Sequence, residues 1–116
     1  MTTGQNQFKG RLKIKFTLTA AQEVKDIISH LAKENPKAAQ NLREALVTKT
    51  KQILTTNPFA GRLLYEYPEY EKKGVRRYLP LPHYSILYFV TDGTIEIWHV
   101  WDNRRNWATL FKEYQN

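Results

Sequence analysis

The chain has 116 residues, 41% of them hydrophobic and 13% aromatic, with 18 Lys and Arg against 11 Asp and Glu, which gives a formal net charge of +7. This length and composition fit one domain with a packed core and exclude wholesale disorder. The positive net charge favours attraction to nucleic acid, the ribosome or an acidic protein, although a net charge can also serve solubility alone. The lack of cysteine excludes disulfides and thiolate-held metals, and with neither a signal peptide nor an apolar run of about 18 residues we expect a cytoplasmic protein that makes no use of a membrane.

A polar tail over residues 1–10 precedes a single domain over residues 11–116. Residues 11–18 alternate basic and apolar side chains, the pattern of a half-buried strand with a basic outer face. Leu18 falls on the apolar side of this strand. We therefore expect the strand to begin the domain and to include Leu18.

Two helices follow the first strand. Thr19 to Gln22 has a capping-box pattern, and apolar residues then recur at helical spacing, so a first helix is expected from about Ala20 to Glu34. Asn35-Pro36 ends it and caps a second helix, which ends before Asn57-Pro58. The short linker predicts an antiparallel helical hairpin.

The remaining elements are strands and turns. From Arg62 the apolar spacing changes to two, with loop signals from Pro68 to Gly74. Strands are expected over 75–81, 84–90 and 94–101, the second of them central because it is almost entirely apolar. Asp92-Gly93 predicts a type I′ turn between the last two strands.

This order of elements predicts an α+β fold. The expected domain has an N-terminal strand and an antiparallel two-helix hairpin on one face of a mainly antiparallel, twisted sheet of three to four strands. The other face is left for function or for a partner. Residues 107–114 are expected to form a short helix or turn after the last strand.

A first group of candidate site residues is basic and interleaved with tyrosines. Arginine forks bind phosphate and tyrosine rings stack on bases, so the group suits single-stranded RNA; a solvated loop with ion pairs to Glu66, Glu69 and Glu71 explains it equally well. The candidate target- or nucleic-acid-binding residues of this group are Arg62, Lys72, Lys73, Arg76 and Arg77.

A second group follows the last strand. Arg104 and Arg105 at a strand end are suited to phosphoryl charge, but one of them is equally suited to pairing with Asp102 or stacking on Trp101 or Trp107.

Histidines and tryptophans complete the candidates. His30, His83 and His99 are possible acids or bases, but each has a structural explanation; His99 is expected on the same strand face as Ile95, Ile97 and Trp101. No metal, nucleotide or serine-hydrolase motif occurs, so no cofactor or metal is expected. The aromatic end of the chain is typical of an interface or of core filling, and its members are Trp98, Trp101, Trp107, Phe111 and Tyr114.

These elements and residues resemble the RelE/ParE superfamily of type II toxins over about Leu18 to Leu110. The resemblance rests on five segments in this order and spacing, at residues 35–39, 57–62, 75–77, 84–88 and 95–105. It implies a toxin neutralised by a cognate antitoxin, whose C-terminal segment wraps it, with Trp98, Trp101, Trp107 and Phe111 as the expected contacts. Operator DNA would be reached only through the antitoxin.

The superfamily has two activities, so the fold alone does not assign one. One branch cleaves mRNA on the ribosome; the other includes plasmid-stabilisation toxins that inhibit DNA gyrase without catalysis. In the RelE-like branch an Arg stands where this chain has Ser85, and a terminal Tyr falls near Phe111, whereas Arg105 matches both branches. The sequence thus favours the ParE-like branch and argues against an enzyme.

Two alternatives stay open. A ribosome-dependent endoribonuclease would draw its catalytic groups from Arg77, Tyr84, His99 and Arg105. The third possibility is a non-toxic co-repressor that acts only together with its antitoxin.

Overall fold

A computed structural model describes residues 12–110. One long helix, continuous from Pro36 to Thr56, is divided into α3, η1 and α4 because its middle six residues are π-helical. The elements in chain order are β1 (Lys13–Phe16), α2 (Leu18–Ala32), α3 (Pro36–Arg43), η1 (Glu44–Lys49), α4 (Thr50–Thr56), β2 (Arg62–Leu63), α5 (Pro68–Lys72), β3 (Arg76–Leu81), β4 (Tyr84–Thr91) and β5 (Thr94–Asp102).

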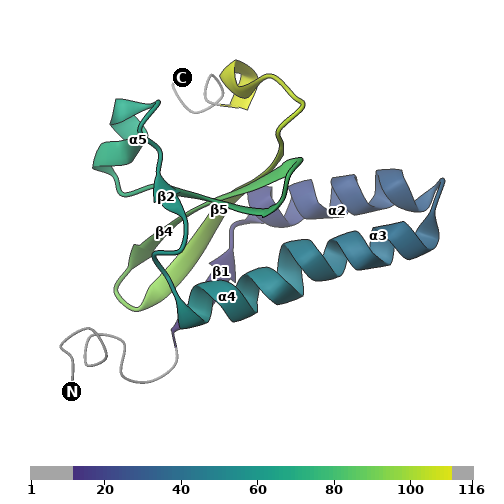
Figure 1. Cartoon of the computed structure of the whole chain (residues 1–116), viewed down its shortest axis with the longest axis horizontal. Coiled ribbons are helices and arrows are strands. Elements are labelled where there is room, and N and C mark those ends of the chain that lie inside the picture. The colour runs from purple at the N-terminus through teal and green to yellow at the C-terminus, as the bar shows by residue number, and fades with distance from the viewer. Residues whose placement is uncertain (1–11, 111–116) are drawn as a thin grey trace.

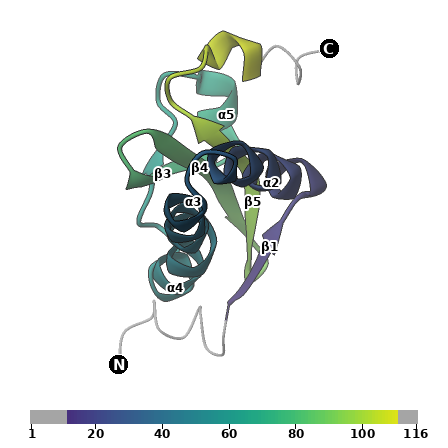
Figure 2. The same cartoon turned by 90° about the vertical axis from the view of Figure 1, so that its right-hand side faces the viewer.

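The strands form one sheet in the order β1-β5-β4-β3-β2, in which β1 pairs with β5 in parallel and all other pairs are antiparallel. The helical hairpin lies on one side of this sheet, and α5 lies on the other (Figures 1 and 2). The α+β prediction is confirmed. The sheet has five strands because Arg62 and Leu63 add a short edge strand to β3. None of the described helices is long and apolar enough to cross a membrane.

The start of α2 differs from the sequence prediction. The N-cap is Thr17, whose hydroxyl accepts a hydrogen bond from the Ala20 amide at 3.0 Å, and not Thr19. Leu18 is therefore already helical and 91% exposed, so its assignment to the apolar side of the first strand was wrong. The physical reason is that Thr17 directly follows β1 in extended conformation, which suits an N-cap.

Two other local predictions are confirmed. The Asn35 side chain accepts a hydrogen bond from the Ala38 amide, and Pro36 occupies the first helical position of α3. Asp92 and Gly93 have φ angles of 48° and 76°, as a type I′ turn requires. The turn joins β4 to β5 and holds them in antiparallel register.

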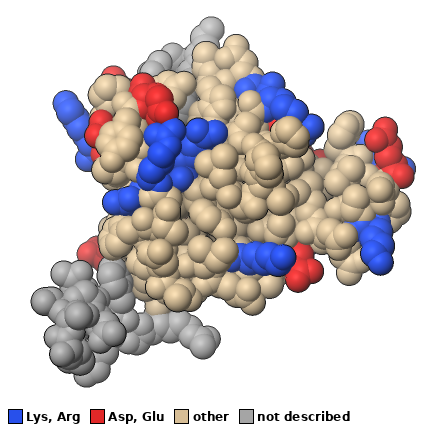
Figure 3. All heavy atoms as spheres, in the orientation of Figure 1, with Lys and Arg blue, Asp and Glu red and all other residues tan. Residues whose placement is uncertain are grey.

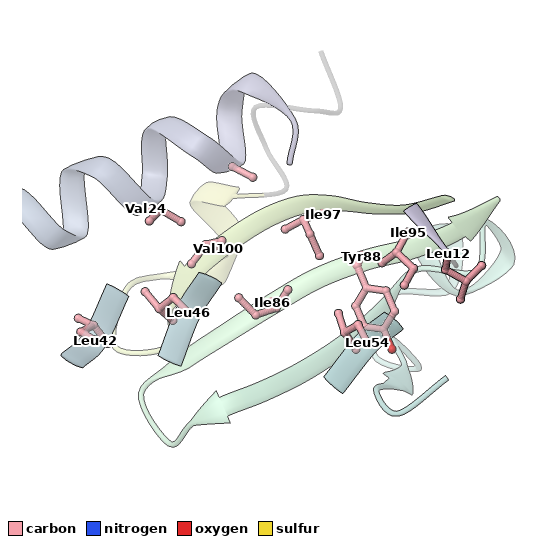
Figure 4. Close-up of a cluster of buried hydrophobic side chains, with 11 residues drawn as sticks. Leu12, Val24, Leu42, Leu46, Leu54, Ile86, Tyr88, Ile95, Ile97 and Val100 are labelled. Atoms are coloured by element: carbon pink, nitrogen blue, oxygen red, sulfur yellow. The ribbon is translucent and has the colours of Figure 1, made fainter. Parts of the chain in front are cut away.

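The main core lies between the helical hairpin and the sheet. Figure 4 shows side chains of β4 and β5 meeting those of the helices. Tyr88 is fully buried there, and its hydroxyl accepts from the Gly61 amide and donates to the Pro58 carbonyl, both at 2.8 Å. The buried residues of this helix-side core are Leu12, Ala20, Val24, Leu42, Leu46, Leu54, Ile86, Tyr88, Ile95, Ile97 and Val100.

The opposite face of the sheet is not left free. Residues 68–72, which the sequence analysis took as loop, form α5, and Trp107–Leu110 form a helical turn on the same side (Figure 1). Pro68 starts α5 because proline fits a first helical position. The buried residues of this aromatic-side core are Leu64, Tyr70, Val75, Leu87, Trp101 and Leu110.

A β-bulge in β5 changes which residues share a face. Leu87 pairs with His99 and Tyr88 with Ile97, so Trp98 is an extra residue in β5. After the bulge Val100 joins the helix-side core, whereas Trp101 joins the aromatic-side core. The expectation that His99 and Trp101 share a face with Ile95 and Ile97 was therefore wrong, because a bulge shifts the period-two pattern by one residue.

Candidate functional site

The two neighbouring arginines of β3 lie on opposite faces of the sheet. Arg76 pairs in register with Tyr88 of the helix-side core, and Arg77 with Leu87 of the aromatic-side core. Arg76 lies 4.9 Å from the Phe59 ring centroid, and its Nη1 donates to the Gly61 carbonyl at 2.7 Å. The basic group predicted from the sequence is thus divided between two surfaces.

Gly61 packs closely against both the backbone of Arg77 and the ring of Tyr88. A Cβ atom at this position would lie 2.8 Å from the Arg77 carbonyl oxygen and 2.9 Å from the Tyr88 ring. Glycine is required here because any side chain would displace β3 or the Tyr88 ring. The backbone of Arg77 is therefore fixed by the same packing that fixes the core.

The side chain of Arg77 is held by polar and aromatic contacts. Its Nε donates to the Ser85 hydroxyl at 2.8 Å, which in turn donates to Asn103 Oδ1 at 2.6 Å. Its guanidinium carbon lies 5.0 Å from the Trp107 ring centroid. Burial, reinforced by the charge of Arg62, lowers the pKa of Arg77. Ser85 therefore serves to orient Arg77.

The other basic residues of this group are already engaged or exposed. The Arg62 guanidinium forms a bidentate ion pair with Glu66, and the hydrogen bond raises the pKa of Arg62 and lowers that of Glu66. The Lys73 Nζ lies 5.7 Å from the Tyr70 ring centroid, and Lys72 is exposed at the end of α5. Figure 3 shows Lys and Arg atoms gathered beside α5, next to the acidic side chains of that helix.

Of the two arginines after β5, one pairs with Asp102 and the other stacks on Trp101. Arg104 is exposed and pairs with Asp102 through two hydrogen bonds of 2.8 and 2.9 Å, which lower the pKa of that carboxyl. Its Nη2 also lies 3.4 Å from the Tyr84 hydroxyl. Arg105 is exposed too, and its guanidinium carbon lies 4.4 Å from the Trp101 ring centroid. Arg105 has no ion pair within residues 12–110.

His99 is buried and held by α2. It is 1% exposed, and its Nδ1 lies 2.9 Å from Glu23 Oε2. Glu23 Oε1 accepts a hydrogen bond from the Val100 amide at 2.9 Å, so this carboxylate satisfies the edge of β5 beyond the end of β1. His30 and His83 are exposed, and His83 lies in the turn between β3 and β4.

A pocket of about 320 Å³ separates α2 from the end of the sheet. One wall carries Glu23, Asp26 and His30 of α2, and the other carries Tyr84, Asp102, Arg104 and Arg105, over the apolar side chains Ile27, Leu31 and Val100. Within residues 12–110 no group of three or more side chains is suited to hold a metal ion.

Two of the pockets formed by residues 12–110 separate the residues considered for nuclease chemistry. Tyr84 and Arg105 line the pocket beside α2, whereas Arg77 lines a different pocket of about 190 Å³ and His99 lines neither. The two pockets lie on opposite sides of β4, since Arg77 belongs to the aromatic side and Val100 to the helix side.

The tryptophans predicted as antitoxin contacts differ in exposure. Trp101 is only 4% exposed and belongs to the aromatic-side core, whereas Trp98 and Trp107 are half-buried at its border. The Trp98 ring lies 5.3 Å from that of Tyr70. Phe111 and Tyr114 lie outside the described residues.

The roles of three residues of this region were not predicted from the sequence. Glu23, Ser85 and Asn103 hold His99 and Arg77 in place. Glu23 looked like any exposed helix residue, and nothing in the local sequence indicates that the edge of β5 needs a carboxylate there. Asn103 offered a signal, because an Asn directly after a strand commonly bonds backbone groups.

Comparisons with known proteins agree with this fold. Residues 14–107 match the family described as the ParE toxin of type II toxin–antitoxin system, parDE. A solved structure of the chromosomal ParDE TA system from P. aeruginosa is similar, with a TM-score of 0.63 and 27% sequence identity over 78% of this chain and 95% of that chain. No curated protein matches the chain. Because the match covers most of the sequence, the chain belongs to the ParE toxin family of type II toxin–antitoxin systems.

Proposed function

We propose that this toxin inhibits DNA gyrase by binding to it and that a cognate antitoxin neutralises it. Family membership and the similarity to a ParDE system support an antitoxin partner. We favour a binding mechanism because the candidate catalytic residues lie at different sites. These residues are Arg77, Tyr84, His99 and Arg105. In this proposal the toxin works in the cytoplasm and reaches operator DNA only through its antitoxin.

RNA cleavage has a stricter geometric requirement than binding. A base, an acid and a cation must all lie within hydrogen-bond reach of one phosphate. His99 is buried and bonded to Glu23, and the Tyr84 hydroxyl lies beside Arg104. Inhibition by binding needs only accessible cations and aromatic rings; Arg105 is exposed, and Trp107 is half-buried and so partly accessible.

A ribosome-dependent nuclease is the second candidate, and the pocket beside α2 favours it. There His30, Tyr84 and Arg105 line one cavity and would supply an acid or base, a hydroxyl and a cation. The opposing carboxylates Glu23 and Asp26 weaken this candidate, since they repel a phosphate backbone.

The test is to induce the chain in cells without an antitoxin and to follow protein synthesis and plasmid supercoiling in parallel. Loss of supercoiling before any fall in translation supports gyrase inhibition. An early fall in translation with codon-specific mRNA cuts would support the nuclease instead. Normal growth would leave the co-repressor role.

Neutralisation is tested by co-expression with the protein encoded next to the toxin. The two should co-purify and growth should recover. The complex should withstand moderate salt, because apolar and aromatic contacts are not screened as surface ion pairs are. A neighbouring product that never co-purifies with the toxin would contradict this part of the proposal.

A further inference from the structure

Arg77 is a half-buried cation that forms no ion pair with any of residues 12–110. Its Nε is bonded to Ser85, but its two terminal nitrogens make no hydrogen bond within residues 12–110. Glu66 lines the same pocket, but both of its carboxylate oxygens accept hydrogen bonds from Arg62. Desolvating a charge without a counter-charge is unfavourable, so an anion that reached Arg77 would be bound.

The guanidinium is held in place before any ligand arrives. Ser85 is fully buried, and Asn103 fixes it while bonding the carbonyls of Pro82 and His83. The Trp107 ring, 5.0 Å away, fixes the plane of the guanidinium from one side. A side chain already held in one orientation loses little freedom on binding, which favours specific recognition.

A small pocket opens beside this cation. It measures about 190 Å³ and is lined by Leu64, Glu66, Tyr67, Arg77 and Trp107. Its walls are therefore mainly apolar and aromatic, and the two charged side chains among them are Arg77, which forms no ion pair within residues 12–110, and Glu66, which is neutralised by Arg62. Such a pocket matches a short apolar stem that ends in a single negative group.

We propose that this pocket binds one carboxylate on a short aliphatic stem, as a glutamate side chain of an acidic peptide presents it. The Arg77 fork would bind the carboxylate, and Tyr67, Leu64 and Trp107 would cover the stem. That the peptide belongs to the antitoxin rests on the proposed function. The pocket itself does not depend on gyrase inhibition.

A nucleic acid fits this pocket less well than a peptide does. A polyanion needs a continuous row of cations. Here Arg62 is paired with Glu66, and Arg76 lies on the other face of the sheet. The carboxylates Glu69 and Glu71 on α5 add repulsion nearby. A single carboxylate avoids both penalties.

The experiment is a nuclear magnetic resonance titration of the full-length chain, which follows the Arg77 Nε–H and Trp107 indole N–H signals. The probes are acetyl-Leu-Glu-Leu-amide, its Gln counterpart and a single-stranded RNA hexamer. The Glu probe should shift both signals, and the Gln probe should not. Equal shifts from the two peptides, or no shift from either, would overturn the proposal; so would stronger binding of the RNA.

Three variants locate the carboxylate. Arg77→Gln should weaken binding of the Glu probe about tenfold or more, the effect of losing a charge-assisted hydrogen bond. Lys72→Gln removes the same charge at an exposed position of α5 and should change binding less than about twofold. An equal loss in both variants would mean nonspecific attraction and contradict the site.

Glu66→Gln covers the case in which Arg77→Gln fails to fold. Removing this acid frees Arg62 and lowers repulsion in the pocket, so the Glu probe should bind at least about twofold more tightly. Unchanged or weaker binding would contradict the proposal. Supercoiling assays of the same proteins report separately on gyrase inhibition, so a failure of either idea is recognised without the other.

Discussion

The two faces of the sheet are built from different chemistry. The helix side buries aliphatic residues from strands and helices, and the hydroxyl of its fully buried tyrosine, Tyr88, is satisfied by two backbone partners. The aromatic side combines tryptophan and tyrosine rings with arginines, and Arg77 and Arg105 lie over Trp107 and Trp101. One face is thus specialised in aliphatic packing, whereas the other holds cations in fixed orientations beside aromatic rings.

Substitutions in the helix-side core should have the largest effect on stability. Leu46→Ala removes a fully buried side chain and should lower the free energy of unfolding by about 2–5 kcal/mol. Ile53→Ala on α4, where Ile53 is 40% exposed, is the control and should cost far less. Urea unfolding curves measure both, and similar losses would break the distinction between core and surface of the hairpin.

Tyr88→Phe tests whether the polar connection within that core matters. It leaves the Gly61 amide and the Pro58 carbonyl buried without a partner and should cost about 1–3 kcal/mol. Tyr65→Phe removes a hydroxyl from a side chain that is 59% exposed and should be close to neutral. Thermal unfolding of the two variants measures the difference. Equal melting temperatures would show that the hydroxyl of Tyr88 does not stabilise the fold.

Trp107→Ala addresses the aromatic side. Since Trp107 is only half-buried, its loss should cost roughly 1–2 kcal/mol of stability, less than Leu46→Ala. Antitoxin binding, measured by calorimetry, should weaken more than this change in stability implies, because the ring positions Arg77. A variant that keeps full antitoxin affinity would place the binding surface elsewhere.

The smallest expected effect concerns the ion pair after β5. Hydrogen bonds from Arg104 lower the pKa of Asp102 in the folded state, so this pair stabilises the fold above the unfolded carboxyl pKa, about 3.9. That contribution should be lost as the pH falls through the lower, folded-state pKa. Asp102→Asn should therefore flatten the fall of stability between about pH 5 and pH 2. Identical pH profiles for variant and parent would contradict the pairing.

The sequence predicted the architecture because its strongest signals are local. Asn35-Pro36, Asp92-Gly93 and the apolar run of β4 each specify a turn, cap or central strand with a physical mechanism. The failures were also local. Thr17 and Thr19 are both good caps, and only the end of β1 selects between them.

The candidate site was harder to predict than the fold. Basic and aromatic residues were proposed for it from the sequence, but the bulge at Trp98 and the alternation of β3 decide which of them meet. The bonds of Arg77 to Ser85 and of His99 to Glu23 join residues 8 and 76 positions apart. Contacts of this kind depend on register and packing, which no short motif encodes.

Action by binding, without turnover, is the core of the proposed function. It is tested most directly by titrating purified gyrase with purified toxin and measuring supercoiling, with the parent chain beside Arg105→Glu and Glu23→Gln. A binding mechanism predicts inhibition that saturates with the ratio of toxin to gyrase. Arg105→Glu should weaken this inhibition because Arg105 is exposed. Glu23→Gln should leave the inhibition intact, because His99, the buried histidine that Glu23 holds, has no part in binding. Gyrase that stays fully active at saturating toxin would contradict the account.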